Sequence, residues 1–462
     1  MKTETRDNYE YLLSVLDKAE KGPMVDQSRW DRNIYKSIKQ LIEKYQIGWD
    51  RDIAVPFDDS LADRLFDAGM ELAVETGVYC LDTGRQMRWT REELEYALAS
   101  EPMSQVLGLG EDAVTICKRR PDDNLDIVVA GGPFGIEVPE TLFIPVMLSY
   151  ANDPLIDFID NASLITTHGR SIRAGSPWEA VGCWQEVGLS FEVLRIAGRQ
   201  GLAIGCAENA PTLIGELASN THQGFRPTDW HHVSFVSELK TTYSDLTKAI
   251  HYAHTNSVSH GFYNPIYGGF VGGVEGMAIA CVAGFILMRA CYCVPTSNVG
   301  PSHSHLSCDT HPDMIPAQAL SFQAISRNTN LLIANFVRPV GGPCTPDILY
   351  EISALTVASI VSGISFTECV QSATGRFPLH ATGLEAHFTA QVAHSSLGLT
   401  RKEANPIVKF LISKYAERQK TLQAGKPFPE AYDVQTIKPT SEWQQIYEEV
   451  CQEIELKVAL TL

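Results

Sequence analysis

The sequence is poor in positive charge. Its 462 residues include 37 lysines and arginines against 55 aspartates and glutamates, so the formal net charge at pH 7 is −18. An acidic surface repels phosphate backbones and anionic lipid headgroups. The sharpest basic run, residues 118–120, is followed at once by Asp122 and Asp123. We therefore expect no nucleic acid and no membrane among the partners of this protein.

Long apolar runs and a cysteine framework are also lacking. The first residues are polar and contain no apolar signal core, and the most apolar stretch, residues 277–288, is too short for a bilayer span. That stretch predicts a buried helix. The eleven cysteines are scattered without the spacing of a disulfide scaffold, which indicates free thiols in a reducing compartment. We expect a cytoplasmic protein.

The order of predicted elements indicates a barrel. The first hundred or so residues show apolar positions at helical spacing, and from about residue 125 short β-rich runs alternate with longer helical ones. Eight units of this kind without a long linker favour a single (β/α)8 TIM barrel over two doubly wound domains. The predicted strands cover residues 127–130, 163–167, 202–206, 233–236, 261–266, 291–294, 331–336 and 364–369.

This pattern predicts one α/β TIM-barrel domain over residues 1–462, with helical additions at both ends. We expect a mainly helical N-terminal extension at residues 1–120, a barrel core at 121–380 and C-terminal helices at 381–462. In a TIM barrel the chemistry lies at the carboxyl ends of the strands, so residues at those ends are the candidates for a site. The glycine-rich turns at 131–133, 268–273 and 341–343 match neither a Rossmann fingerprint nor a P-loop.

Ionisable residues near the predicted strand ends are candidates for catalysis. His232 could act as a general acid or base near neutral pH. Glu208 and Glu238 could work as a pair of carboxylates, and each could instead bind a backbone amide or an arginine. For His232 the alternative is a loop histidine that only makes hydrogen bonds.

Aromatic residues gather in the same regions. Trp230, Phe262, Tyr263 and Phe336 fall at or near predicted strand ends, where they could surround a cationic substrate by cation–π attraction. The alternative is ordinary packing of the barrel.

A histidine-rich segment offers the donor atoms of a metal site. His303, His305 and Cys308 lie within six positions, and imidazole and thiolate ligands suit zinc. The spacing matches no known zinc-finger pattern, and loop histidines commonly make only hydrogen bonds. We therefore expect no metal as the first hypothesis and keep these three residues as the candidate ligands.

Eight segments spread over nearly the whole sequence match one known family. They are residues 19–23, 77–85, 173–179, 238–240, 268–275, 342–345, 382–386 and 432–440. Through these segments the sequence resembles the monomethylamine:corrinoid methyltransferases. The resemblance implies a (β/α)8 barrel, a homo-oligomer such as a hexamer, and transfer of a methyl group from a small substrate to the cobalt of a separate corrinoid protein. The cobalamin is then carried by the partner, and no covalently bound cofactor is expected on this chain.

The resemblance breaks down at the active site. Methylamine-type members carry pyrrolysine where Ile214 stands here, and an aliphatic side chain cannot form the amine adduct of pyrrolysine. By the same alignment, two glutamates and a glutamine of the family are replaced by His232, Phe262 and Phe336. A quaternary ammonium leaves as a neutral amine without an adduct, and aromatic rings bind such cations. We therefore hypothesise a methyltransferase for a quaternary amine, with Ile214 and the aromatic residues binding the substrate.

Two alternatives remain open from the sequence. In the first, zinc held by the histidine-rich segment activates a donor of the thiol or alcohol type. In the second, the chain is a non-catalytic relative that senses a ligand, because several active-site residues are replaced. The retained Glu208, Glu238 and His303, on different strand ends, favour an enzyme.

Overall fold

A closed parallel sheet forms the centre of the protein. The computed structural model describes residues 4–205, 212–458 and 460–462. Eight strands pair in the order β11–β7–β5–β19–β18–β16–β14–β12, and a parallel bridge from Gly205 to Trp230 closes the sheet between β11 and β12. The strands are β5 (Val128–Gly131), β7 (Phe158–Ile159), β11 (Ala203–Ile204), β12 (Trp230–Phe235), β14 (Val258–Tyr263), β16 (Thr296–Val299), β18 (Leu332–Val337) and β19 (Phe366–Val370).

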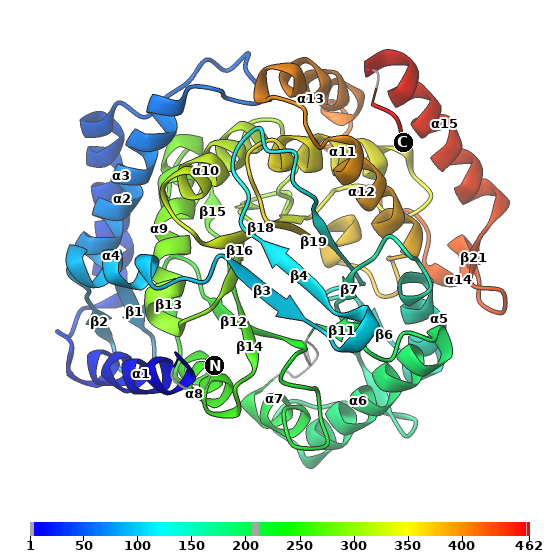
Figure 1. The fold of residues 1–462 in the computed structure, drawn as a ribbon, viewed down its shortest axis with the longest axis horizontal. Helices are drawn as coiled ribbons and strands as arrows, with labels where there is room; N and C mark the ends of the chain where they lie inside the picture. Colours follow the sequence, from blue (N-terminus) through cyan, green and yellow to red (C-terminus); the bar gives the residue numbers. More distant parts are fainter. Residues whose placement is uncertain (1–3, 206–211, 459) are drawn as a thin grey trace.

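A helix follows each of these strands, and the helices form a ring around the sheet (Figure 1). The predicted (β/α)8 barrel is confirmed. The ring consists of α5 (Glu140–Ala151), α6 (Pro177–Ala197), α7 (Leu213–Ser219), α8 (Tyr243–Thr255), α9 (Val274–Tyr292), α10 (Met314–Asn328), α11 (Pro346–Ile360) and α12 (Gly383–Ser395).

The N-terminal segment covers the outside of the ring. It contains α1 (Glu4–Lys21), α2 (Gln27–Tyr45), α3 (Asp59–Thr76), α4 (Arg91–Ala99) and the strands β1 (Val78–Cys80) and β2 (Arg85–Met87). Helix α2 begins at the Asp26 cap and buries Trp30, Ile34, Ile38 and Leu41, which recur at helical spacing on one face. Strand β1 also pairs with β13 (Lys240–Thr241), and this pairing ties the segment to the barrel.

A hairpin covers the amino-terminal end of the barrel. It consists of β3 (Ser104–Leu107), η1 (Gly110–Asp112) and β4 (Val114–Cys117), and it lies across the barrel in Figure 1. Leu107 and Ile116 pack in one cluster with the inward side chains of the strands. The backbone N–H groups of Gly108 and Leu109 donate to carbonyls at the starts of β12 and β11. A ligand of the barrel must therefore enter at the carboxyl-terminal end.

The C-terminal segment lies beside α11 and α12. It contains α13 (Arg401–Tyr415), α14 (Phe428–Ala431), β20 (Tyr432–Asp433), β21 (Lys438–Pro439) and α15 (Ser441–Val458). Helix α12 packs against both α11 and α5, so it is the last helix of the ring. The ring of barrel helices therefore ends at residue 395. The division into units at residues 120 and 380 stays a prediction. The short elements of the connecting loops are β6 (Glu137–Val138), β8 (Ser163–Leu164), β9 (Thr166–Thr167), β10 (Arg170–Ser171), β15 (Ile266–Tyr267), β17 (Ser302–His303) and η2 (Ser372–Gly375).

Two of the eight predicted strands are wrong. Residues 163–167 form β8 and β9 outside the barrel, and the barrel strand at this point is β7. Residues 291–294 include the end of α9, and the barrel strand there is β16. Helix α9 is buried almost all round, so it lacks the polar face that would mark it as a helix. Strand β16 reads Thr-Ser-Asn-Val, so it lacks an apolar run.

Helix α9 belongs to the core, as predicted for its apolar stretch. By length and composition it could cross a membrane, but 94% of its apolar window is buried inside the protein, where it packs against α3, α10 and β14. Gly284 allows this packing: a Cβ at this position would lie 2.3 Å from the Tyr263 ring. The ring of Tyr263 therefore occupies the space between β14 and α9.

This contact gives a test of the packing. We expect Gly284→Ala to lower the free energy of unfolding by about 1–3 kcal/mol, because the added methyl group overlaps the Tyr263 ring. Denaturant unfolding followed by circular dichroism measures the change. The control is Gly188→Ala in α6, where a Cβ meets nothing within 4 Å; it should raise the stability by up to ~1 kcal/mol. Equal effects of the two substitutions would contradict the packing described.

Candidate active site

The parallel register decides which side chains enter the barrel. His232 on β12 lies opposite His260 on β14, and His260 lies opposite Thr296 on β16. Two residues further along β14, Phe262 lies opposite Asn298. Residues paired in this way point to the same face of the sheet. The ring contacts of His232 with Trp230, His260 and Phe262 show that this face is the interior.

Three phenylalanines form an aromatic cluster in the carboxyl-terminal half of the barrel. Phe134, Phe262 and Phe336 contact one another with ring centroids 5.3–5.7 Å apart, and we call these three residues the aromatic cluster. Phe336 is fully buried and Phe262 is 9% exposed, whereas Phe134 is half-buried. The centroid of the His232 ring lies 5.3 Å from that of Phe134, and the planes of the His232 and Phe262 rings are parallel. The structure therefore brings together His232, Phe262 and Phe336 of the predicted site residues.

A polar layer lies next to the aromatic cluster inside the barrel. Ligand-type atoms of His232, His260 and Glu368 lie within 4.8 Å of one another, and a second group of this kind joins Glu368 to Asp160 and Cys369. All five side chains are buried. His260 Nε2 lies 3.7 Å from Glu368 Oε2. Burial, together with the neighbouring His232, holds the pKa of His260 well below its usual range.

Trp230 forms the floor of the polar layer. Its ring contacts His260 at 4.0 Å and His232 at 4.8 Å, and on the other side it packs edge-on against Phe158 and Phe366. The indole N–H donates to Thr296 Oγ1, which is also 3.0 Å from His260 Nδ1. Trp230 therefore packs against the polar layer on the side of the amino-terminal ends of the strands. Among the residues that the structure describes, no ring contact joins Trp230 to the aromatic cluster, so its role in substrate binding stays a prediction.

Arg338 places a positive charge beside the aromatic cluster. Its guanidinium carbon lies 5.1 Å from the centre of the Phe336 ring, and its N–H groups donate to Gln371 Oε1 and Asn264 Oδ1. Both acceptors are neutral, and within the part of the chain that the structure describes no carboxylate forms an ion pair with this guanidinium. Burial lowers the pKa of Arg338 from its usual value, and the charges of Asp309 and Glu368 oppose this shift. A buried guanidinium whose hydrogen bonds go to neutral acceptors is suited to an anionic ligand.

Tyr263 and Glu238 lie on the other face of the sheet, and the prediction that they belong to the site is corrected. Tyr263 follows Phe262 on β14, so it points outward to α9. Its hydroxyl donates to Glu238 Oε2 at 2.7 Å, and Ile266 N donates to Glu238 Oε1. Burial raises the pKa of Glu238 to about 7. Both side chains stabilise the junction between β14 and the N-terminal segment, where Trp30 Nε1 donates to the Glu238 carbonyl.

The predicted pyrrolysine position lies at the start of α7. Ile214 is 51% exposed, and its N–H donates to the Thr212 cap. Glu179 of α6 holds this turn, because it accepts hydrogen bonds from Thr212 and Gly215. No contact joins Ile214 to the aromatic cluster among the residues that the structure describes, so its role stays a prediction. The predicted catalytic Glu208 lies outside the described residues.

Within the described residues, the structure does not bring the candidate zinc ligands of the histidine-rich segment together. His303 Nδ1 accepts hydrogen bonds from the backbone N–H groups of His305 and Leu306, so it is already used within the loop. Cys308 is buried next to Glu351, and burial holds the pKa of its thiol well above the usual range. Among the described residues, the groups of ligand atoms that lie close enough to bind a metal include none of His303, His305 and Cys308. The catalytic role of His303 remains untested.

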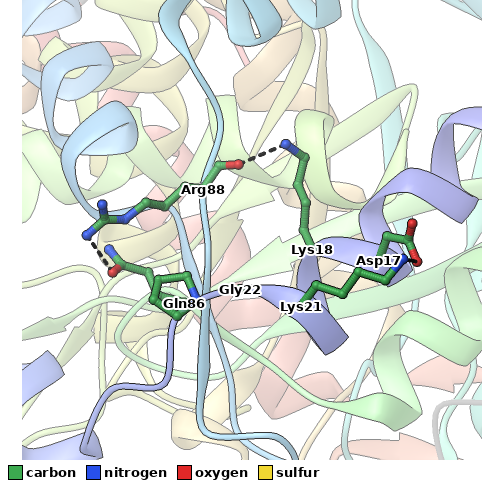
Figure 2. A pocket seen from close by; sticks show the side chains of 7 residues that line it. Asp17, Lys18, Lys21, Gly22, Gln86 and Arg88 are labelled. Atoms are coloured by element: carbon green, nitrogen blue, oxygen red, sulfur yellow. Dashed lines mark hydrogen bonds and ion pairs between the residues drawn. The ribbon is translucent and has the colours of Figure 1, made fainter.

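A surface pocket outside the barrel is not a better candidate. It lies between α1 and β2 and is drawn in Figure 2. Lys18 donates to the Arg88 carbonyl and to Glu93, Lys21 pairs with Asp17, and Arg88 donates to Gln86. These polar groups already bind one another, so they present no free set to a ligand.

Several buried residues near the site are not among those predicted from the sequence: His260, Asp160, Asn298 and Arg338. His260 stands two positions before Phe262, as Trp230 does before His232. This two-residue spacing could have predicted His260, because alternate residues share a face of a strand. No pattern in the neighbouring sequence predicts a functional role for Arg338. This residue becomes part of the site through its contact with Phe336 in the folded protein.

Sequence comparison with known proteins gives one consistent result. The family model described as monomethylamine methyltransferase MtmB matches residues 11–458. The monomethylamine methyltransferase MtmB1 of Methanosarcina barkeri is 32% identical over 433 residues, which cover 94% of each chain. MtmB of Methanosarcina mazei is 31% identical over 437 residues, with the same coverage.

Solved structures agree with the sequences. The crystal structure of the Methanosarcina barkeri monomethylamine methyltransferase matches with a TM-score of 0.95 and 31% identity over 98% of each chain. A crystal structure of the hydroxylamine MtmB complex matches with the same values. Agreement of sequence and fold over nearly the whole length identifies a methyltransferase. The chain belongs to the monomethylamine methyltransferase MtmB family.

Proposed function

We propose that this enzyme transfers a methyl group from a small quaternary amine that carries a carboxylate to the Co(I) of a separate corrinoid protein, without pyrrolysine. The observation that carries the proposal is the aromatic cluster beside the buried guanidinium of Arg338. The relatives are named for monomethylamine. The difference in substrate follows from the side chains that face the barrel interior here.

The leaving group explains why such a substrate needs no electrophilic residue. When the methyl carbon is attacked by Co(I), the carbon–nitrogen bond breaks and the nitrogen keeps the electron pair. A quaternary ammonium then leaves as a neutral tertiary amine, and no proton has to be supplied. A primary amine would need a proton or an adduct before it could leave. With Ile214 at the predicted pyrrolysine position, this side chain cannot form an adduct.

The charges around the cluster favour a zwitterion over a bare cation. The aromatic faces attract a quaternary ammonium, but the Arg338 guanidinium stands beside Phe336. Two unit positive charges about 6 Å apart repel by about 3 kcal/mol at an effective dielectric constant of about 20. A carboxylate on the substrate changes this repulsion into an attraction and can accept two N–H groups of the guanidinium. A betaine has both groups within one small molecule.

The corrinoid protein must approach the carboxyl-terminal end of the barrel. The β3–β4 hairpin covers the opposite end, and the aromatic cluster and Arg338 lie on the carboxyl-terminal side. The cobalamin belongs to the partner, which acts as the methyl acceptor. We propose a homo-oligomer and a cytoplasmic location by analogy with the family.

The direct experiment compares methyl donors. The purified protein is incubated with Co(I) cobalamin, and methylcobalamin formation is followed by absorbance. The donors are a betaine, tetramethylammonium, monomethylamine, methanol and methanethiol. We expect the betaine to give the highest kcat/KM and tetramethylammonium a lower one, because it lacks the carboxylate. Activity on monomethylamine alone would refute the proposal.

Arg338 is expected to set the preference for the carboxylate. Loss of a charge-assisted hydrogen bond costs about 1.5–3 kcal/mol, so Arg338→Gln should raise the KM for the betaine about 10- to 100-fold. The KM for tetramethylammonium should stay the same or fall. The matched control is Arg199→Gln, because Arg199 bonds backbone carbonyls before β7, at the other end of the barrel. An equal loss with both donors would speak against a carboxylate site.

The aromatic faces are expected to bind the ammonium. Phe262→Leu keeps an apolar side chain and removes the ring, and loss of a cation–π contact worth about 0.5–2 kcal/mol should raise the KM about 2- to 30-fold. Phe158→Leu is the control, since this ring packs beneath Trp230 and not in the aromatic cluster. It should change the stability and leave the KM unchanged. If Phe262→Leu leaves the KM unchanged, the ammonium does not bind at this ring.

A further inference from the structure

We infer that His232, His260 and Glu368 form a binding site for a divalent ion of the zinc class inside the barrel. The inference goes beyond the proposed function, because it concerns an ion and not the methyl donor. The three side chains come from β12, β14 and β19, and all are buried. Strand β19 is not adjacent to the other two in the sheet, so the ligands converge across the interior.

The geometry of the three ligands suits a small ion. Bonds of about 2.0–2.2 Å to zinc place tetrahedral ligand atoms roughly 3.3–3.6 Å apart. His260 Nε2 and Glu368 Oε2 are 3.7 Å apart, close to that spacing. One ligand atom from each of the three residues lies within 4.8 Å of the other two, so the three side chains are close enough to share one ion. Two imidazoles and a carboxylate are the ligands of known catalytic zinc sites with an open position.

The hydrogen bonds around His260 favour the tautomer with the proton on Nδ1. Its Nε2 then has a lone pair, and this lone pair faces Glu368. Thr296 Oγ1 accepts from Trp230 Nε1 and is within reach of the Ser259 carbonyl and of His260 Nδ1. All these groups are satisfied if the Thr296 hydroxyl donates to Ser259 and His260 Nδ1 donates to Thr296. A lone pair then faces a carboxylate oxygen at 3.7 Å. Two electron-pair donors in this arrangement attract a cation, and the Thr296 contact is the usual outer support of a metal-bound histidine.

Asn298 provides an independent indication of a bound polar species. This residue is fully buried on β16, one inward position beyond Thr296 and opposite Phe262. Within the described part of the chain, neither its amide oxygen nor its amide nitrogen has a hydrogen-bond partner. A buried amide without a hydrogen-bond partner is unfavourable, because its desolvation is not compensated. A water or substrate atom on the open position of the ion could accept from this amide.

The adjoining group makes the site more suitable for zinc than for magnesium or calcium. Glu368 also belongs to a second group with Asp160 and Cys369, so a further carboxylate and a thiol lie next to the proposed ion site. Nitrogen and sulfur donors suit zinc, whereas calcium and magnesium prefer oxygen. Bound there, zinc would supply Lewis acidity next to the aromatic cluster.

Metal binding is tested on the full chain without an activity assay. The protein is stripped with a chelator, loaded with zinc, dialysed and analysed by mass spectrometry. We expect about one zinc per chain, and with Co(II) the visible absorption of a four- or five-coordinate site. His260→Gln should lower the affinity by about 100-fold or more, because even loss of a supporting residue costs 10- to 100-fold. Thr296→Val should cost about 10- to 100-fold by removing that support.

The control is the double substitution His303→Gln and His305→Gln, which removes the other histidine cluster. It should leave the zinc content and the Co(II) spectrum unchanged. If zinc is absent from the loaded protein, or is lost in this control while Thr296→Val and His260→Gln retain it, the site does not exist as proposed. These readouts are independent of the methyl donor, so failure of the betaine assay and failure of zinc binding are distinguishable.

Discussion

The closed parallel barrel imposes a two-residue alternation on each strand, and the chemistry of this protein depends on that constraint. On β12 it turns Trp230 and His232 inward, and His231 outward to the Arg226 carbonyl. On β14 it turns His260 and Phe262 inward, and Tyr263 outward to α9. A shift of one residue in the register of β14 would exchange its two sets and replace His260 with Ser259 or Gly261 in the interior.

Inside the barrel the side chains are arranged along its axis. An apolar floor covered by the β3–β4 hairpin supports the polar layer, and the aromatic cluster with Arg338 lies beyond it toward the carboxyl-terminal end. His232, His260 and Glu368 of the polar layer and the Arg338 side chain are buried, so their charges act in a medium of lower dielectric constant than water.

The fold could be predicted from the sequence because alternating strands and helices leave a periodic signal. The prediction is wrong at the end of α9 and at β16 because the periodic pattern is absent there. Helix α9 is apolar on all sides, and β16 is polar although it is buried. Phe262 and Phe336 could be predicted from the family alignment, and the structure brings them together. The sequence alone does not show that Phe262 points inward and Tyr263 outward, because this depends on the register of β14. Arg338, Asp160 and Glu368 meet the other groups only across the closed sheet, and that information is not local.

The central claim is that the barrel interior binds a quaternary amine through its aromatic faces and a carboxylate through Arg338. A crystal structure of the protein with a betaine tests it most directly. The account predicts the carboxylate oxygens within hydrogen-bond distance of the Arg338 guanidinium and the methylated nitrogen against Phe262 and Phe336. A betaine bound elsewhere, such as at the His303 loop, with Arg338 unchanged, would contradict it.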